Sequence, residues 1–240
     1  MLWWTLSRKI ISDPEASPMS RFILSVSVLA LIAGGCNDNN QNNSQAYQQT
    51  ATQGKPVVSI VPVIDNTKSE YDWNLSDELS SMIYYRIAQQ DNVAIVEAPR
   101  VRAKTKKIKE SDNPFGPDIS WIKNTFQGDQ FVVFLELVEH EEVYKQDRKK
   151  TAAIEECSAD LNMSMRVRVF DLRGKEPKIV LQELIHDSHF IPRQFTQANF
   201  YQVPWGHESF SISPIGLAHA EFTKEVSSRL EDYILMATKD

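Results

Sequence analysis

The sequence is poor in the residues from which most recognisable chemical sites are built. It has only two cysteines, Cys36 and Cys157, and eight glycines in 240 residues. The sequence contains no paired cysteines at zinc-binding spacing, no glycine-rich phosphate loop and no Gly-x-Ser-x-Gly motif. These absences exclude a cysteine-based zinc site, a phosphate-binding loop and a serine-hydrolase elbow. We therefore expect no enzyme activity and no cofactor.

An excess of basic residues is also missing. The chain has 26 Lys and Arg against 32 Asp and Glu, a formal net charge of −6. Without residues 1–36 the balance is 23 basic to 30 acidic residues, or about −7. A nucleic-acid-binding domain usually carries a basic surface, so this charge argues against a nucleic-acid partner.

The N-terminal apolar run is too short to cross a bilayer, which takes about 20 residues. This run, Phe22–Ile32, covers eleven residues; it follows Met19-Ser20-Arg21 and precedes Ala33-Gly34-Gly35. A basic residue, a short apolar run and small residues in this order are typical of a secretory signal peptide, which we predict for residues 1–36. Because residues 1–18 contain Asp13, Glu15 and two prolines, which a signal peptide does not need, either translation starts at Met19 or these residues form a long, atypical leader.

Cys36 directly follows the small residues, which resembles the lipobox of bacterial lipoproteins, with Ala33 in place of the usual leucine. The resemblance implies that Cys36 is acylated with palmitate-type lipid and anchors the chain in a membrane. Residues 37–55, rich in Asn and Gln, are predicted to be a disordered tether with a reach on the order of 20–25 Å. Because Asn37 rather than Asp follows the cysteine, the resemblance implies the outer membrane, facing the periplasm. Cys157, left without a cysteine partner in the chain, is either buried or pairs between chains.

Residues 56–240 are predicted to form one globular domain that begins with a strand and a helix. The apolar run at 57–64 predicts a strand covered on both faces, although Pro62 favours an edge position or an early end. Asn74 is predicted to cap a helix that ends near Gln90. Further predicted elements are strands at 93–96 and 131–138 and a helix beginning at Asp118 or Ser120.

The clearest pattern is the alternation of apolar and polar residues at 161–170. It predicts a strand with one buried and one solvent-exposed face, followed by a turn at 171–175 and an antiparallel partner at 179–185. The last helix is predicted to begin at Pro214, with an apolar stripe of Phe222, Val226, Leu230 and Tyr233. Together these elements predict an α+β fold, an α/β sandwich. It would have a mixed sheet of about five strands, helices packed on the sheet and a C-terminal helix.

Several segments together resemble bacterial envelope domains. They are VVSIVPVIDNT, LSDELSSMIYYRI and MRVRVFDLRGKEPKIVLQ, and the domain from Pro56 to Ala237 resembles the TolB N-terminal and LpoB-type domains. Gly128-Asp129-Gln130 keeps only part of the Gly-Ala-Asp turn found in such domains. The whole chain also resembles a lipoprotein family of chlamydia-like bacteria. These resemblances imply a non-enzymatic accessory or assembly factor that binds another envelope protein.

Aromatic residues gather without a regular period between residues 190 and 210. Large aromatic side chains in an irregular segment are typical anchors for a protein partner. The candidates for partner binding are Phe195, Phe200, Tyr201 and Trp205. Alternatively, these residues fold back under the segment as a satellite core.

Ligand or metal binding through His140 and the pair His186/His189 is the alternative function. Imidazoles bind zinc or copper, and Glu141 or Glu142 would complete such a site if the strand ends lie together. On a strand, however, residues three apart point to opposite faces, so His186 and His189 do not suit one metal ion. A third hypothesis, a subunit of an oligomeric secretion pore, predicts large rings in solution.

Overall fold

The computed structural model describes residues 54–69, 71–145, 158–192 and 203–239. The chain divides into two compact units, residues 1–41 and 42–240, and every described residue belongs to the second. Outside the described residues lie Cys36, the tether up to residue 53, Cys157, Phe195, Phe200 and Tyr201. Their predicted roles stay predictions. None of the described helices combines the length and the apolar character that crossing a bilayer requires.

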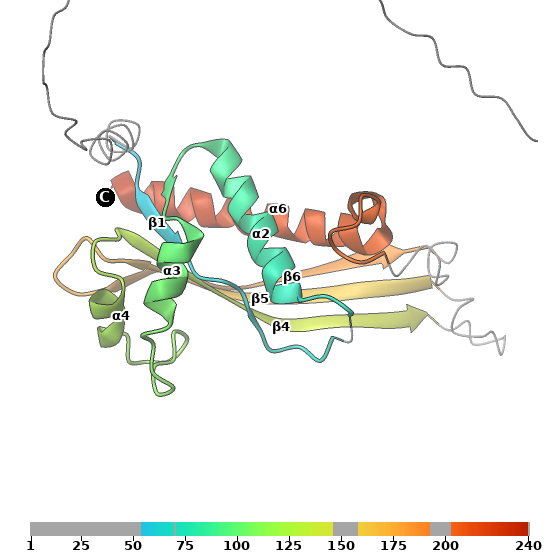
Figure 1. The fold of residues 1–240 in the computed structure, drawn as a ribbon, viewed down its shortest axis with the longest axis horizontal. Coiled ribbons are helices and arrows are strands. Elements are labelled where there is room, and N and C mark those ends of the chain that lie inside the picture. The colour runs from blue at the N-terminus through green and yellow to red at the C-terminus, as the bar shows by residue number, and fades with distance from the viewer. Residues whose placement is uncertain (1–53, 70, 146–157, 193–202, 240) are drawn as a thin grey trace, which may run out of the picture. The chain divides into compact units, whose positions relative to one another are not determined.

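A mixed open sheet of six strands forms the middle of this unit (Figure 1). The strand order is β3-β1-β4-β5-β6, and β2 pairs with β4 beyond the end of β1. Three strands are short: β1 (Val57–Ile60), β2 (Ile64–Asp65) and β3 (Ala94–Ile95). Three are long: β4 (Phe131–Lys145), β5 (Ser158–Asp171) and β6 (Lys178–Ile191). β1 is parallel to β3 and β4, and β2 is parallel to β4, whereas β4, β5 and β6 pair antiparallel. The predicted α+β fold is confirmed, with one strand more than the approximate number expected.

The additional strand arises because the apolar run at 57–64 is interrupted. β1 ends at Ile60 and β2 begins at Ile64, and both pair with β4. Pro62 lies in the interruption and has no amide hydrogen with which to continue a ladder. The early end that Pro62 favours is confirmed, whereas one continuous strand over 57–64 is wrong.

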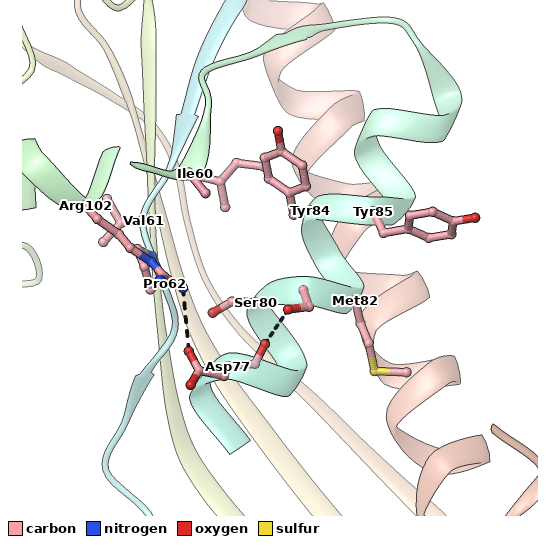
Figure 2. A pocket seen from close by; sticks show the side chains of 11 residues that line it. Ile60, Val61, Pro62, Asp77, Ser80, Met82, Tyr84, Tyr85 and Arg102 are labelled. Atoms are coloured by element: carbon pink, nitrogen blue, oxygen red, sulfur yellow. Dashed lines mark hydrogen bonds and ion pairs between the residues drawn. The ribbon is translucent and has the colours of Figure 1, made fainter. Parts of the chain in front are cut away.

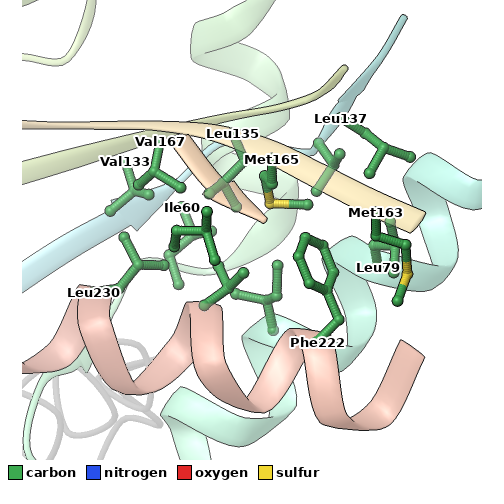
Figure 3. Packing of buried hydrophobic residues seen from close by; sticks show 14 of the residues in the cluster. Ile60, Leu79, Val133, Leu135, Leu137, Met163, Met165, Val167, Phe222 and Leu230 are labelled. Atoms are coloured by element: carbon green, nitrogen blue, oxygen red, sulfur yellow. The ribbon is translucent and has the colours of Figure 1, made fainter. Parts of the chain in front are cut away.

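Helices cover both faces of the sheet. The long helices α2 (Leu75–Gln90) and α6 (Pro214–Lys239) pack on one face, together with the short 3₁₀ helix η3 (Phe210–Ile212). The short helices α3 (Ala98–Thr105) and α4 (Ser120–Thr125) pack on part of the other face (Figure 1). The larger core lies between the sheet and the two long helices, where Leu79 of α2 and Phe222 of α6 meet Leu135 and Met165 (Figure 3).

The strand face that was expected to be solvent-exposed is partly covered. Arg166 is exposed, but Arg168 and Phe170 are buried because α3 and α4 pack over this end of β5. The Arg168 guanidinium donates hydrogen bonds to the backbone oxygens of Pro114, at 3.0 Å, and of Gly116, at 2.8 Å. The alternation therefore predicted the strand and its core face correctly but not the cover on its second face.

The predicted helix boundaries of α2 and α6 are confirmed. The Asn74 side chain accepts a hydrogen bond from the Asp77 amide at 3.1 Å, which caps α2, and Pro214 is the first residue of α6. The predicted stripe of α6 is wrong at one position. Tyr233 is 39% exposed, and Ile234, four residues after Leu230, completes the buried stripe instead.

Candidate functional site

A groove of about 520 Å³ opens between α2, α3 and the segment that joins β1 to β2 (Figure 2). Its floor is formed by Ile60, Val61 and Pro62. One wall is α2, with Met82, Tyr84 and Tyr85 among its lining residues; the other is α3, with Ala98 and Arg102. A concave surface of this size, mostly apolar with a few polar groups, has the properties of a binding site.

Two opposite charges face each other across the groove. The Asp77 carboxylate lies 3.7 Å from the Arg102 guanidinium, and their side chains are 52% and 64% exposed. An exposed ion pair of this length contributes less than about 1 kcal/mol to stability. Both charges are therefore available to a bound molecule. Tyr84 and Tyr85 also line the α2 wall, and the Tyr85 ring, 61% exposed, points away from Arg102 (Figure 2).

The sequence of α2 explains why this helix serves both the core and the groove. Leu79, Ile83 and Ile87 recur at helical spacing and are buried against the sheet. Asp77 and Tyr85 lie on a different side of the helix and line the groove. Since residues about four apart share one side of a helix, the apolar stripe decides which of the other side chains face outward.

A chain of polar side chains is buried where β4, α2 and α6 meet. Glu78 and His219 have no exposed surface. One oxygen of Glu78 accepts a hydrogen bond from His219 Nδ1 at 2.6 Å, and the other accepts from Trp73 Nε1 at 2.6 Å. His219 Nε2 lies 2.8 Å from His140 Nε2, and His140 Nδ1 lies 3.3 Å from the Ser69 hydroxyl. A hydrogen bond between two imidazole nitrogens needs one donor and one acceptor, so a single proton lies between the rings.

Burial and the neighbouring His219 lower the pKa of His140 to about 3. His140 is therefore neutral at pH 7. Burial and the Glu142 carboxylate raise the pKa of Tyr71, whose hydroxyl donates a hydrogen bond to Glu142 at 3.0 Å. The Tyr71 ring also stacks on Trp73, with 4.4 Å between the ring centroids. This buried chain fixes the segment before α2, and its inaccessible carboxylate and imidazole do not suit a reaction with a substrate.

Sequence reasoning missed Glu78 and His219. In the sequence Glu78 resembles the carboxylates that the helix dipole favours in a first turn, and His219 resembles an ordinary polar residue of an amphipathic helix. A weak signal exists, because each of them takes a position on an apolar stripe. Glu78 lies three residues after Leu75, and His219 lies three residues before Phe222. Two polar residues on the apolar sides of two helices indicate partners for each other.

The histidines of the alternative metal site are not brought together. His140 contacts His219 of α6, whereas His186 lies 2.9 Å from the Ser164 hydroxyl and 3.6 Å from Glu139. His189 pairs with Glu221 of α6 at 3.1 Å. Within the described ranges, no three or more His, Cys, Asp or Glu side chains are grouped so as to hold a metal ion. The expectation that His186 and His189 point to opposite faces agrees with these partners.

The described aromatic residues between 190 and 210 lie partly in the core and partly on the surface. Phe210 is 5% exposed and packs against Trp73 and His219, with centroid distances of 5.8 and 6.3 Å. Trp205 is 37% exposed, and Phe190 is 52% exposed beneath the Lys145 ammonium. Phe210 thus belongs to the core, whereas Trp205 is accessible to a partner.

The sequence matches one family over most of its length. The family model, described as "Family of unknown function (DUF7499)", covers residues 44–238. The chain belongs to this family. No curated protein matches this DUF7499 member in sequence.

Solved structures add a likeness of fold. The hypothetical protein CT253 from Chlamydia trachomatis is 24% identical, with a TM-score of 0.57, over 75% of this DUF7499 chain and 98% of that one. At this identity the likeness shows the fold alone. The lipoprotein GNA1162 from Neisseria meningitidis is 10% identical, with a TM-score of 0.38, over 56% of this chain and 83% of that one. A minor lipoprotein from Acinetobacter baumannii is 8% identical, with a TM-score of 0.34, over 73% and 90%. These two likenesses are too remote to carry an argument, and the resemblance to TolB N-terminal and LpoB-type domains stays a prediction.

Proposed function

We propose that this DUF7499 member is a lipid-anchored, non-enzymatic envelope lipoprotein that binds another envelope protein as an accessory or assembly factor. The observation that carries the proposal is the groove between α2 and α3. It combines a mostly apolar lining that includes Tyr84 and Tyr85 with the weakly paired charges of Asp77 and Arg102. Aromatic and arginine side chains at a concave surface are typical anchors of protein interfaces.

The lipobox-like sequence at Cys36 supports the anchor. Acylation of this cysteine would hold the chain on the outer membrane, facing the periplasm, and residues 37–55 would keep the folded unit off the membrane surface. A domain held in this way explores a small volume near the membrane. It therefore meets membrane-associated partners at a high effective concentration.

Trp205 supports a second contact with the same partner. It is partly exposed, and it follows the predicted partner-binding residues Phe195, Phe200 and Tyr201 in the sequence. We include this aromatic set in the proposed interface.

Palmitate labelling tests the anchor. Cells that express the wild-type chain or Cys36→Ala are grown with labelled palmitate, and their envelopes are then fractionated. We expect label in the wild type alone, together with the outer membrane. A wild-type chain that takes up no label and stays in the soluble fraction would contradict the proposal that the protein is a lipoprotein.

Site-specific photocrosslinking tests the partner. A benzophenone amino acid replaces Tyr85 in the groove or, as a matched control, Leu184 on β6, which is 58% exposed. We expect a discrete crosslinked species from position 85 that position 184 does not give. Equal or absent crosslinking at both positions would remove the basis of the groove as a binding site.

A further inference from the structure

The groove lies at an edge of the sheet where β1 continues beyond the end of its neighbour β3. Along β1 the backbone groups alternate between the two adjacent strands. On one side, the Val61 amide donates to the Val133 oxygen of β4 at 3.0 Å. On the other side, the Val96 amide donates to the Val58 oxygen at 2.9 Å. Because the direction alternates with each residue, the amide and carbonyl of Ile60 point to the side of β3.

β3 ends before it reaches Ile60. It pairs with β1 only at Val57 and Val58, and the chain then turns into α3. Among the described residues, neither the amide nor the carbonyl of Ile60 has a hydrogen-bond partner. Ile60 is 8% exposed, and the backbone polar groups of a buried residue normally have a partner in the protein, in water or in a ligand.

The open stretch of this edge is short and clearly bounded. At its far end, the Val63 amide donates to the Ser80 hydroxyl at 2.8 Å, and the Val63 oxygen accepts from the Ser76 hydroxyl. Both serines belong to α2, so α2 satisfies the edge at this point. Pro62, just before it, has no amide to satisfy. The unpaired part of the edge is therefore the segment from Ile60 to Pro62, which is also the floor of the groove.

The walls of the groove belong to the two helix layers. α2 packs on one face of the sheet and α3 on the other, and both line the groove beside Ile60. A space that lies in the plane of the sheet, between the helix layers and beside an unpaired strand edge, has the position of a further strand. An extended peptide is the ligand whose shape and hydrogen bonds fit that position.

We infer that the groove binds an extended segment of a partner protein by strand addition to β1 at Ile60. This inference rests on the proposed function and specifies how the same groove recognises its partner. One backbone amide and one carbonyl of the segment pair with Ile60, and an aliphatic side chain packs against the α2 wall. The α3 wall carries Arg102, so the segment presents a carboxylate to that wall.

Amide hydrogen exchange on the processed, unlipidated chain tests the free edge. Residues 42–240 form a compact unit of their own, so a chain that begins at residue 36 and carries Cys36→Ala keeps every described element. We expect the Ile60 amide to exchange at least 100-fold faster than the Val61 amide, which is bonded to β4. Equal protection of the two amides would show that the edge is already paired and would overturn the inference.

Crosslinking from position 85 in cells then tests the bound state. Ile60→Pro removes the unpaired amide hydrogen and also replaces the buried side chain with a proline ring, whereas Ile60→Val keeps the hydrogen and loses only one methyl group. We expect at least a tenfold loss of the crosslinked species in Ile60→Pro and wild-type yield in Ile60→Val. If Ile60→Pro lowers the melting temperature, an α-hydroxy acid with the isoleucine side chain replaces Ile60 and removes the same hydrogen. Wild-type yield from a folded variant without this hydrogen would overturn strand addition.

The two possible failures are distinguishable. If position 85 gives no crosslinked species in the wild type, the proposed partner binding fails together with the strand addition. If position 85 captures a partner and the capture does not depend on the Ile60 amide, partner binding stands and only the strand addition fails. Arg102→Glu adds a check of the charge. We expect at least a fivefold loss of capture, and an unchanged yield would rule out an acidic segment.

Discussion

Asp77 and Glu78 are neighbours in the first turn of α2, yet they belong to opposite kinds of region. Asp77 lines the open groove, is half exposed and is weakly paired with Arg102 at 3.7 Å. Glu78 is completely buried and accepts two hydrogen bonds of 2.6 Å, from Trp73 and His219. A rotation of about 100° around the helix axis separates the two side chains. Within one turn, α2 therefore directs one carboxylate into the closed core, where its hydrogen bonds are complete, and another onto an open surface, which is the part that suits binding.

The largest expected difference between the two regions concerns these carboxylates themselves. Glu78→Ala leaves the Trp73 and His219 donors without an acceptor in the interior, so we expect the free energy of unfolding to fall by about 3–5 kcal/mol. Asp77→Ala removes an exposed, weakly paired charge and should cost less than about 1 kcal/mol. Urea unfolding of both variants measures the difference. Similar losses in the two variants would contradict the contrast between a closed and an open region.

Phe210 and Trp205 differ in the same way, because Phe210 is buried and Trp205 is partly exposed. Phe210 is buried against Trp73 and His219, and Phe210→Ala should destabilise the fold by about 3–4 kcal/mol. Trp205 is partly exposed, and Trp205→Ala should cost less than about 1 kcal/mol while reducing partner capture. Thermal unfolding and crosslinking from position 85 provide the two readouts. A large drop in melting temperature for Trp205→Ala would instead place this side chain in a satellite core.

The buried chain should also make stability depend on pH. The pKa of His140 is about 3 in the fold, against 6.5 as its ordinary value, so the folded state binds fewer protons than the unfolded state. The contribution is therefore fully present above pH 6.5 and is lost as the pH falls towards 3, at up to about 1.4 kcal/mol per pH unit. Between pH 6.5 and 4.5 we expect a loss of about 2–3 kcal/mol.

The control for this titration is His140→Asn, which cannot take up the proton. Urea unfolding of both proteins across the same pH range isolates the contribution of His140. We expect the difference in unfolding free energy between wild type and variant to shrink as the pH falls. Parallel pH profiles would mean that His140 is not held neutral by its surroundings.

The cap of α2 should have a smaller effect that reaches both regions. Asn74→Ala removes the hydrogen bond to the Asp77 amide, and the loss of such a cap typically costs about 1 kcal/mol. Because α2 supports both the groove and the buried chain, the variant should also weaken crosslinking slightly. Asn74→Asp keeps an acceptor at this position and serves as the matched control. An unchanged unfolding free energy for Asn74→Ala would show that the cap does not stabilise α2.

The smallest expected effect on stability belongs to Arg102. Arg102→Ala breaks an exposed ion pair of 3.7 Å, so we expect the free energy of unfolding to change by less than about 0.5 kcal/mol. Partner capture from position 85 should nevertheless fall, because the charge on the α3 wall is lost. If Arg102→Ala loses stability but keeps full capture of the partner, Arg102 supports the fold and does not belong to the binding surface.

Several parts of the fold could be predicted because their signals are local. The cap at Asn74, Pro214 at the start of α6 and the alternation in β5 each depend on residues within one or two turns. Pro62 also gave a correct local signal, since it marks the interruption between β1 and β2. The cover over Phe170 could not be predicted, because it depends on where α3 and α4 pack rather than on β5 itself.

The sequence by itself determined the signal-like start, the low cysteine and glycine content, the acidic balance and the order of helices and strands. These features depend on composition or on the short-range period of the chain. The tertiary structure alone decided that His140 meets His219 rather than His186, and that the Ile60 backbone faces a groove between two helix layers. Both results join segments far apart in the sequence, and the packing of the helices on the sheet sets such distances. The site therefore depends on contacts that no local pattern records.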